Sequence, residues 1–93
     1  MARSLYLVSY DISNDRTRTR VAHLLEGYGE RVQFSVFEVW LDHRERAKLR
    51  ARLAKAVAEE GSVRLYGLCA ACRERAEVLG EGDLTQELGL LIV

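Results

Sequence analysis

The sequence has no hydrophobic run long enough to span a membrane, no signal-peptide pattern, no internal repeat and no low-complexity segment. These absences argue against a membrane-spanning, secreted or repeat protein, and we expect a cytoplasmic one. Its 93 residues are 48% hydrophobic and 30% charged, the proportions of an ordinary soluble globular protein. The length corresponds to one domain with room for a small core.

The chain also lacks net charge, because 14 Lys and Arg residues balance 14 Asp and Glu residues. A neutral chain is not a generic coat for nucleic acid. The charges are nevertheless unevenly distributed: residues 1–58 contain eleven basic against seven acidic residues, and residues 59–93 contain three against seven. The first part therefore carries a net charge of +4 that can face an anion, and the second part carries −4.

Cysteine is scarce, and Cys69 and Cys72 form the single CxxC pattern. A structural zinc site requires four ligands, and neither His23 nor His43 has a spacing that would complete one. Zinc would therefore need a second pair of ligands from another chain. We favour two reduced thiols in a turn, which agrees with a cytoplasmic setting.

The first third of the chain has the pattern of a strand followed by a helix. Residues 5–10 are apolar and aromatic on both faces apart from Ser9, which predicts a central strand. Residues 15–28 have one apolar helical face, and we expect Asp15 to cap the start of this helix and Gly29 its end. That face consists of Val21, Leu24, Leu25 and Tyr28.

The middle of the chain repeats the change from strand to helix. Residues 31–41 are rich in Val, Phe and Trp, but their alternation breaks around Phe34 and Ser35, which leaves a tight hairpin or a kinked strand open. Residues 42–60 contain no glycine or proline and predict a second helix, with Asp42 as its cap and Gly61 as its end.

The remaining residues complete the predicted fold. Residues 62–68 predict another strand, residues 69–74 a turn and residues 76–79 a short edge strand. The order β-α-β-β-α-β is the α+β, ferredoxin-like sandwich, here with an extra C-terminal edge strand. We assign residues 1–80 to this domain and residues 81–93 to a C-terminal tail for dimerisation or partner docking. A small domain with an apolar end at residues 88–93 is expected to form a homodimer.

The strongest functional signal is an acid between the first strand and an arginine-rich helix start. A carboxylate at Asp11 costs solvation energy unless it is exposed, hydrogen-bonded or bound to a cation. Arg16, Arg18 and Arg20 lie in the first helical turns, where the helix dipole disfavours cations, so an external anion would explain them. The pattern indicates chemistry on phosphates. The alternatives are a loop hydrogen bond for Asp11 and a solvated face for the arginines, which we prefer for Arg16.

Two long patterns connect the chain to a known family: YDISNDRTRTRV at residues 10–21 and YGERVQFSVFE at residues 28–38. They resemble the small CRISPR-associated proteins that act in spacer acquisition and are described as metal-dependent endoribonucleases. SVRLYGLCAAC and EVLG extend the resemblance over most of the chain. It implies a ferredoxin-like homodimer in which Asp11 of each subunit faces the other across the twofold axis and coordinates magnesium. It also implies roles in nucleic-acid binding for Tyr10, Arg18, Arg20, Arg31, Ser35 and Phe37.

The resemblance leaves two functions open. The first is a magnesium-dependent endonuclease that cleaves single-stranded RNA or duplex DNA, with Asp11 as catalytic residue and metal ligand. Mg²⁺ usually takes one or two protein carboxylates, so a pair of Asp11 residues would suffice. The second is a non-catalytic homodimeric scaffold that binds duplex DNA and bridges the CRISPR integrase, with residues 81–93 as a docking element. The acid and arginine pattern disfavours a plain interaction module.

Two aromatic residues and the basic surface of the second predicted helix each allow two interpretations. Tyr10 and Phe37 are either platforms on which bases stack or members of the core, and the second is the more common role of such residues. The second helix has a basic surface that is suited to a nucleic-acid backbone or is simply solvated. Its cations are Arg44, Arg46, Lys48, Arg50, Arg52 and Lys55.

Overall fold

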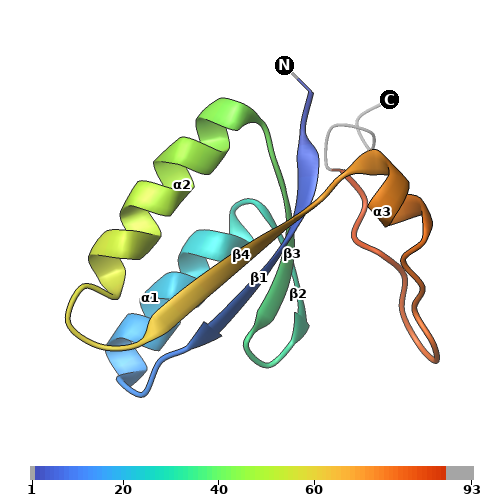
Figure 1. Cartoon of the computed structure of the whole chain (residues 1–93). Coiled ribbons are helices and arrows are strands. Elements are labelled where there is room, and N and C mark those ends of the chain that lie inside the picture. Colours follow the sequence, from blue (N-terminus) through green and yellow to red (C-terminus); the bar gives the residue numbers. More distant parts are fainter. Residues whose placement is uncertain (1, 88–93) are drawn as a thin grey trace.

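A four-stranded antiparallel sheet forms the centre of the computed structural model, which describes residues 2–87 (Figure 1). The strand order is β2-β3-β1-β4, so β1 is central as the sequence predicted. The order of strands and long helices confirms the ferredoxin-like α+β fold. The elements are β1 (Ser4–Asp11), α1 (Asp15–Glu26), β2 (Gly29–Gln33), β3 (Val36–Leu41), α2 (His43–Ala56), β4 (Ser62–Leu68) and α3 (Ala70–Glu74).

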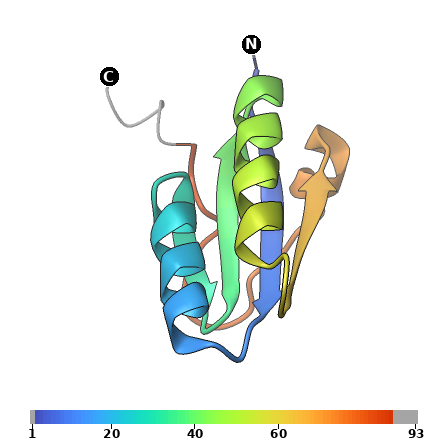
Figure 2. The ribbon, with the colours of Figure 1, turned by 90° about the vertical axis from the view of Figure 1, so that its left-hand side faces the viewer.

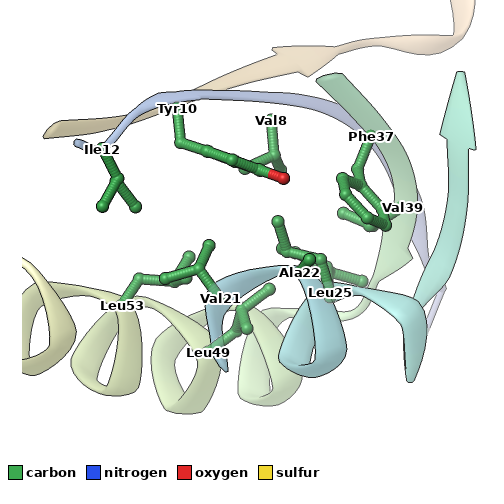
Figure 3. Packing of buried hydrophobic residues seen from close by; sticks show 11 residues of the cluster. Val8, Tyr10, Ile12, Val21, Ala22, Leu25, Phe37, Val39, Leu49 and Leu53 are labelled. Atoms are coloured by element: carbon green, nitrogen blue, oxygen red, sulfur yellow. The ribbon is translucent and has the colours of Figure 1, made fainter. Parts of the chain in front are cut away.

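The two long helices cover one face of the sheet, and the core lies between them and the strands (Figure 2). Val8 and Tyr10 of β1 pack there against Phe37 of β3 and Val21 of α1 (Figure 3). Since strand side chains alternate between faces, the neighbours of these residues lie on the opposite face, called the outer face below. Part of the outer face is covered near Trp40 of β3, whose ring carries the Arg73 guanidinium 5.0 Å from its centroid.

The start of α1 differs from the prediction. Asn14, not Asp15, is the N-cap, because its side-chain oxygen accepts a 2.9 Å hydrogen bond from the backbone N–H of Thr17. Asp15 instead begins the helix and pairs with Arg18. Asp15 is thus neither the predicted cap nor a carboxylate without a partner.

The end of α1 also differs, because Gly27 is its C-cap and Gly29 already belongs to β2. A side chain at Gly29 would collide with the backbone of Glu38 on the neighbouring strand. This glycine is needed for close strand pairing rather than for ending the helix.

The α2 cap agrees with the prediction, but the helix is shorter than expected. Asp42 and Glu45 form a capping box, in which each side chain accepts from the backbone N–H of the other residue. The helix ends at Ala56 rather than near residue 60. Beyond it, Glu60 accepts a 2.8 Å hydrogen bond from the N–H of Ser13, and Gly61 has φ +89°. The chain leaves the helix early because it must turn back to pair β4 with β1.

Residues 31–41 form a hairpin rather than one kinked strand. Its turn contains Phe34 and Ser35, between β2 and β3, and the pairing register shifts between Arg31 and Gln33. The break in alternation therefore marked the turn. A two-residue connection is typical of antiparallel neighbours.

The predicted edge strand at residues 76–79 is wrong, since no strand follows β4 within the described part of the chain. Residues 70–74 of the predicted turn form the short helix α3, and Leu79 beyond it is 89% exposed. Residues 77–79 and 81–83 line a cleft beside β2 together with Glu30, Arg31 and Glu38.

The segment after residue 80 returns to the outer face. The Trp40 indole N–H donates a 2.8 Å hydrogen bond to the carbonyl oxygen of Thr85, and the Thr85 hydroxyl donates a 2.8 Å bond to Glu38. The division at residue 80 stays a prediction, as does the homodimer, and the apolar end at residues 88–93 lies outside the described residues. No helix among residues 2–87 is both long enough and apolar enough to cross a bilayer.

Candidate functional site

Asp11 is the last residue of β1, opposite Ser62 of β4. Because Val8 and Tyr10 point into the helix-covered core, the alternation of the strand places Asp11 on the outer face, where it is exposed. Within residues 2–87 its carboxylate makes no hydrogen bond or ion pair in the structure. A hydrogen bond to the loop therefore does not explain this acid.

A metal ion at Asp11 would need further ligands from outside the described part of this chain. Among the residues that the structure describes, no three His, Cys, Asp or Glu side chains are grouped so that they could hold an ion. An exposed carboxylate without a partner nevertheless fits Mg²⁺, which keeps several waters and takes one or two carboxylates. A second Asp11, water and substrate phosphate would complete its ligands.

Arg18 is engaged with the loop that follows β1. Its guanidinium donates to the carbonyl oxygens of Ile12 at 2.9 Å and Ser13 at 3.2 Å, and it pairs with Asp15. These contacts hold the turn immediately after Asp11. The predicted phosphate role of Arg18 is untested, whereas its part in fixing the loop is visible.

Arg31 lies over the ring of Phe37, with its guanidinium carbon 5.3 Å from the ring centroid. Arg31 itself is exposed, which suits the predicted contact with phosphate. Phe37 and Tyr10 are 0% and 5% exposed (Figure 3). Their burial favours the core interpretation, in which Phe37 supports Arg31 from below and neither ring offers a free face to a base.

Ser35 contributes through its backbone. Its carbonyl oxygen accepts a 3.1 Å hydrogen bond from the N–H of Tyr10 and so joins the hairpin turn to the end of β1. The described structure shows Ser35 half-buried. Its predicted role toward nucleic acid stays a prediction.

Arg20 lies apart from Asp11, in a groove of about 350 Å³ between α1 and α2. Arg52 and Lys55 of α2 line the same groove above an apolar floor of Val21, Leu24 and Ala56. None of these three cations has an ion-pair partner among residues 2–87. Arg20, for which the resemblance implies a role in nucleic-acid binding, thus lies beside two cations of the basic surface of α2.

The comparison with known families decides which proteins share this arrangement. Residues 4–76, from β1 through α3, match the family described as CRISPR associated protein Cas2. The chain belongs to the Cas2 family. The family resemblance read from the sequence is therefore confirmed, and it covers every element that the structure describes.

Similar proteins agree with this assignment. A Chloroflexus aurantiacus protein named CRISPR-associated endoribonuclease Cas2 1 is 51% identical and covers 83% of this chain and 85% of its own length. A Thermus thermophilus protein named CRISPR-associated endonuclease Cas2 2 is 41% identical over 92% of both chains. A solved chain from a partial Cas6-RT-Cas1–Cas2 complex is 32% identical with a TM-score of 0.70, and covers 82% of this chain and 90% of that one.

One exposed aromatic of this Cas2-family chain was missed in the sequence. Phe34 is 75% exposed at the hairpin turn, where it lines a groove with Tyr10, Arg18 and Arg31. The sequence signal was the broken alternation around Phe34 and Ser35, which showed a turn but not which aromatic ring it would expose. The family resemblance implies a role for Phe37, but that ring is buried.

The CxxC pair lies at the start of α3, away from these residues. Both thiols are free and exposed, and Cys69 caps the helix by accepting a 3.3 Å hydrogen bond from the N–H of Cys72. This backbone hydrogen bond lowers the pKa of Cys69, whereas the side-chain hydrogen bond with Cys69 raises the pKa of Cys72. The two thiols are not bonded to each other, and the choice between reduced thiols and a zinc site shared with another chain stays a prediction.

Proposed function

We propose that this Cas2-family chain is a magnesium-dependent endonuclease of CRISPR spacer acquisition that cleaves phosphodiester bonds in single-stranded RNA or duplex DNA in the cytoplasm. The observation that carries the proposal is Asp11, whose carboxylate is exposed at the end of a central strand and makes no hydrogen bond or ion pair within residues 2–87. The names of the Chloroflexus and Thermus relatives support nuclease activity.

The proposed active form is a homodimer that brings two Asp11 carboxylates together. The outer face is open along β1 in the single chain, where Val36 of β3, opposite Ser9, is partly exposed and Tyr66 of β4, opposite Leu7, is 48% exposed. A second copy that covers this face would bury apolar surface and place its own Asp11 nearby. Each subunit would then contribute one carboxylate to a shared Mg²⁺ site.

Different residues of the chain would bind the metal, position the loop and bind the substrate phosphates. Bound Mg²⁺ would polarise a phosphoryl oxygen and lower the pKa of its bound water. Asp11 would hold the metal, Arg18 would keep the following loop in place, and the exposed Arg31 would bind a phosphate near the turn. Arg20 would bind the nucleic-acid backbone in the groove between α1 and α2.

A second candidate is a non-catalytic homodimeric scaffold that binds duplex DNA and bridges the CRISPR integrase. The three cations of the groove between α1 and α2 favour it, because they are distant from Asp11 and suit a phosphate backbone. The Cas1–Cas2 complex among the similar structures supports an integrase partner. Residues 81–93 are the proposed docking element.

The deciding experiment compares the wild type with Asp11→Ala and Asp11→Asn on labelled single-stranded RNA and duplex DNA, with Mg²⁺ or with EDTA. Glu74→Gln is the control, because Glu74 is an exposed acid at the end of α3, outside both the proposed metal site and residues 81–93. We expect cleavage only with Mg²⁺ and only when Asp11 is present. Sedimentation should give twice the 10.6 kDa chain mass for all four proteins.

The results separate the two functions. Cleavage by Asp11→Ala at the wild-type rate would assign the activity to a contaminant or to another site. Duplex binding and integrase association without any cleavage would favour the scaffold. A stable monomer at micromolar concentration would remove the shared metal site, because a single Asp11 would be left to hold the ion.

A further inference from the structure

The hairpin turn presents an aromatic ring to solvent from a backbone that is bonded to β1. Phe34 is 75% exposed, while its carbonyl oxygen accepts a 3.5 Å hydrogen bond from the Tyr10 hydroxyl. The next carbonyl, that of Ser35, accepts from the Tyr10 backbone N–H at 3.1 Å. Two contacts with one buried residue of β1 therefore hold the turn. The backbone of the turn is therefore already ordered before a partner binds, which lowers the entropic cost of binding there.

The surroundings of Phe34 are cationic rather than apolar. The ring borders a groove of about 230 Å³ on the α1 side of the hairpin. Two arginines and a histidine line this groove with a single carboxylate, that of Glu26. Its principal lining residues are Tyr10, Arg18, His23, Glu26, Arg31 and Phe34. An aromatic face beside guanidinium groups is the combination that single-stranded nucleic acids bind.

Arg31 is the cation in this groove that is best placed for an incoming phosphate. Its guanidinium rests over Phe37, which orients it without an ion pair among the described residues. Arg18 already donates hydrogen bonds to the carbonyl oxygens of Ile12 and Ser13. Charge complementarity thus points to an anionic ligand with a flat apolar part, and a nucleotide has both.

We propose that Phe34 and Arg31 form a subsite for one unpaired nucleotide of a polynucleotide strand, with the base stacked on the Phe34 ring and its phosphate bound by Arg31. This inference rests on the proposed function, because it takes a polynucleotide as the ligand. It adds a binding residue outside the predicted set and a requirement that the bound base be unpaired.

The position of the subsite relates it to the cleavage site. The turn lies at the same end of the sheet as the end of β1 (Figure 1), and Tyr10, which holds it, directly precedes Asp11. Asp11 lies on the outer face, whereas the groove lies on the α1 side. The subsite therefore binds a nucleotide that flanks the cleaved bond and leaves the metal position free.

The test measures fluorescence anisotropy of a labelled single-stranded RNA of about 12 nucleotides in EDTA, so that cleavage does not interfere. Phe34→Ala should weaken binding about tenfold, because stacking on one aromatic ring contributes about 1 to 3 kcal/mol per base. Phe34→Tyr should retain wild-type affinity. Val32→Ala is the matched control, since Val32 is a 42% exposed apolar residue of the same hairpin.

An abasic version of the strand identifies the base as the group that stacks. Wild type and Phe34→Ala should bind the abasic strand equally, whereas Arg31→Ala should weaken the binding of both strands. Unchanged RNA affinity of Phe34→Ala, or an equal loss with the abasic strand, would overturn the subsite.

The remaining outcomes separate this inference from the proposed function. If Phe34→Ala converts a dimer into a monomer, the ring is a subunit contact and the subsite is wrong. A wild-type protein that binds no polynucleotide contradicts both proposals. Cleavage by Asp11→Ala at the wild-type rate, together with tenfold weaker RNA binding by Phe34→Ala, would overturn the nuclease site and support the subsite.

Discussion

The guanidinium group of Arg18 donates a 2.9 Å hydrogen bond to the backbone carbonyl oxygen of Ile12. This bond ties the first turn of α1 to the residue that follows Asp11. An arginine that the sequence pattern assigned to phosphate thus has a visible role in fixing the loop beside the acid. A cation near a helix start is stabilised here by two carbonyl oxygens and Asp15.

Replacing Arg18 should loosen this loop. We expect Arg18→Ala to lower the free energy of unfolding by about 1 kcal/mol, because hydrogen bonds from a partly exposed charged group are lost. Cleavage should also slow through kcat, since Asp11 remains but its loop is less fixed. Urea unfolding and initial rates measure these effects, with the exposed Arg16→Ala as control. A loss confined to KM, with unchanged stability, would show that Arg18 binds substrate instead.

The groove between α1 and α2 should contribute to the salt dependence of binding. If Arg20, Arg52 and Lys55 each neutralise a phosphate, their triple alanine variant should bind duplex DNA with a log–log salt slope flatter by about 3 × 0.9. Titrations between low and moderate salt measure the slope. Arg75→Ala, an exposed cation beyond α3, should leave it unchanged. Equal slopes for the triple variant and the wild type would show that this groove does not contact the backbone.

The ion pair between Arg3 and Glu45 should make stability depend on pH. The hydrogen bond from Arg3 lowers the pKa of Glu45 below its ordinary value. The folded state therefore binds this proton less readily than the unfolded state, and the pair stabilises the fold above the ordinary pKa of Glu45. This contribution should be lost as the pH falls through the lowered pKa.

Urea unfolding at several acidic pH values tests this prediction with Glu45→Gln as the comparison. The difference in midpoint between wild type and variant should shrink as the pH decreases. Glu74→Gln serves as control, because Glu74 is an exposed acid at the end of α3. A constant difference between wild type and Glu45→Gln would contradict the role of the ionised pair.

The contact between Thr85 and β3 should be visible in tryptophan fluorescence. Thr85→Val removes the hydroxyl that donates to Glu38 at 2.8 Å and should lower the free energy of unfolding by about 1.5 kcal/mol. Trp40 is the single tryptophan, and its N–H bonds to the Thr85 carbonyl oxygen, so its emission should shift to the red. Gln86→Ala is the matched control, as its side chain is exposed. Identical spectra and midpoints would mean that the segment is not held by this bond.

Local sequence patterns predicted most elements because helices and strands depend on periodicity and caps. The α1 stripe with Val21 and Leu25 is buried, and Asp42 caps α2 with Glu45 as its reciprocal partner. The hairpin appeared as a break in alternation. The errors were also local: Asn14 competes with Asp15 as a cap, and both residue types accept hydrogen bonds from the helix start.

The edge strand and the aromatic roles depended on tertiary contacts. Residues 76–79 form no strand and leave Leu79 89% exposed, although their sequence resembles a strand. Likewise, sequence alone gives Phe34 and Phe37 the same chemistry, but the turn exposes the first and the helices bury the second.

The sequence by itself determined the order of elements from β1 to β4, the family and the acid at the end of β1, because each is encoded by neighbouring residues. Only the tertiary structure decided that Arg18 holds the loop, that Arg20 meets Arg52 and Lys55, and that Phe34 is the exposed ring. Burial and hydrogen-bond partners depend on which distant segments pack together, and a one-dimensional pattern does not contain that information.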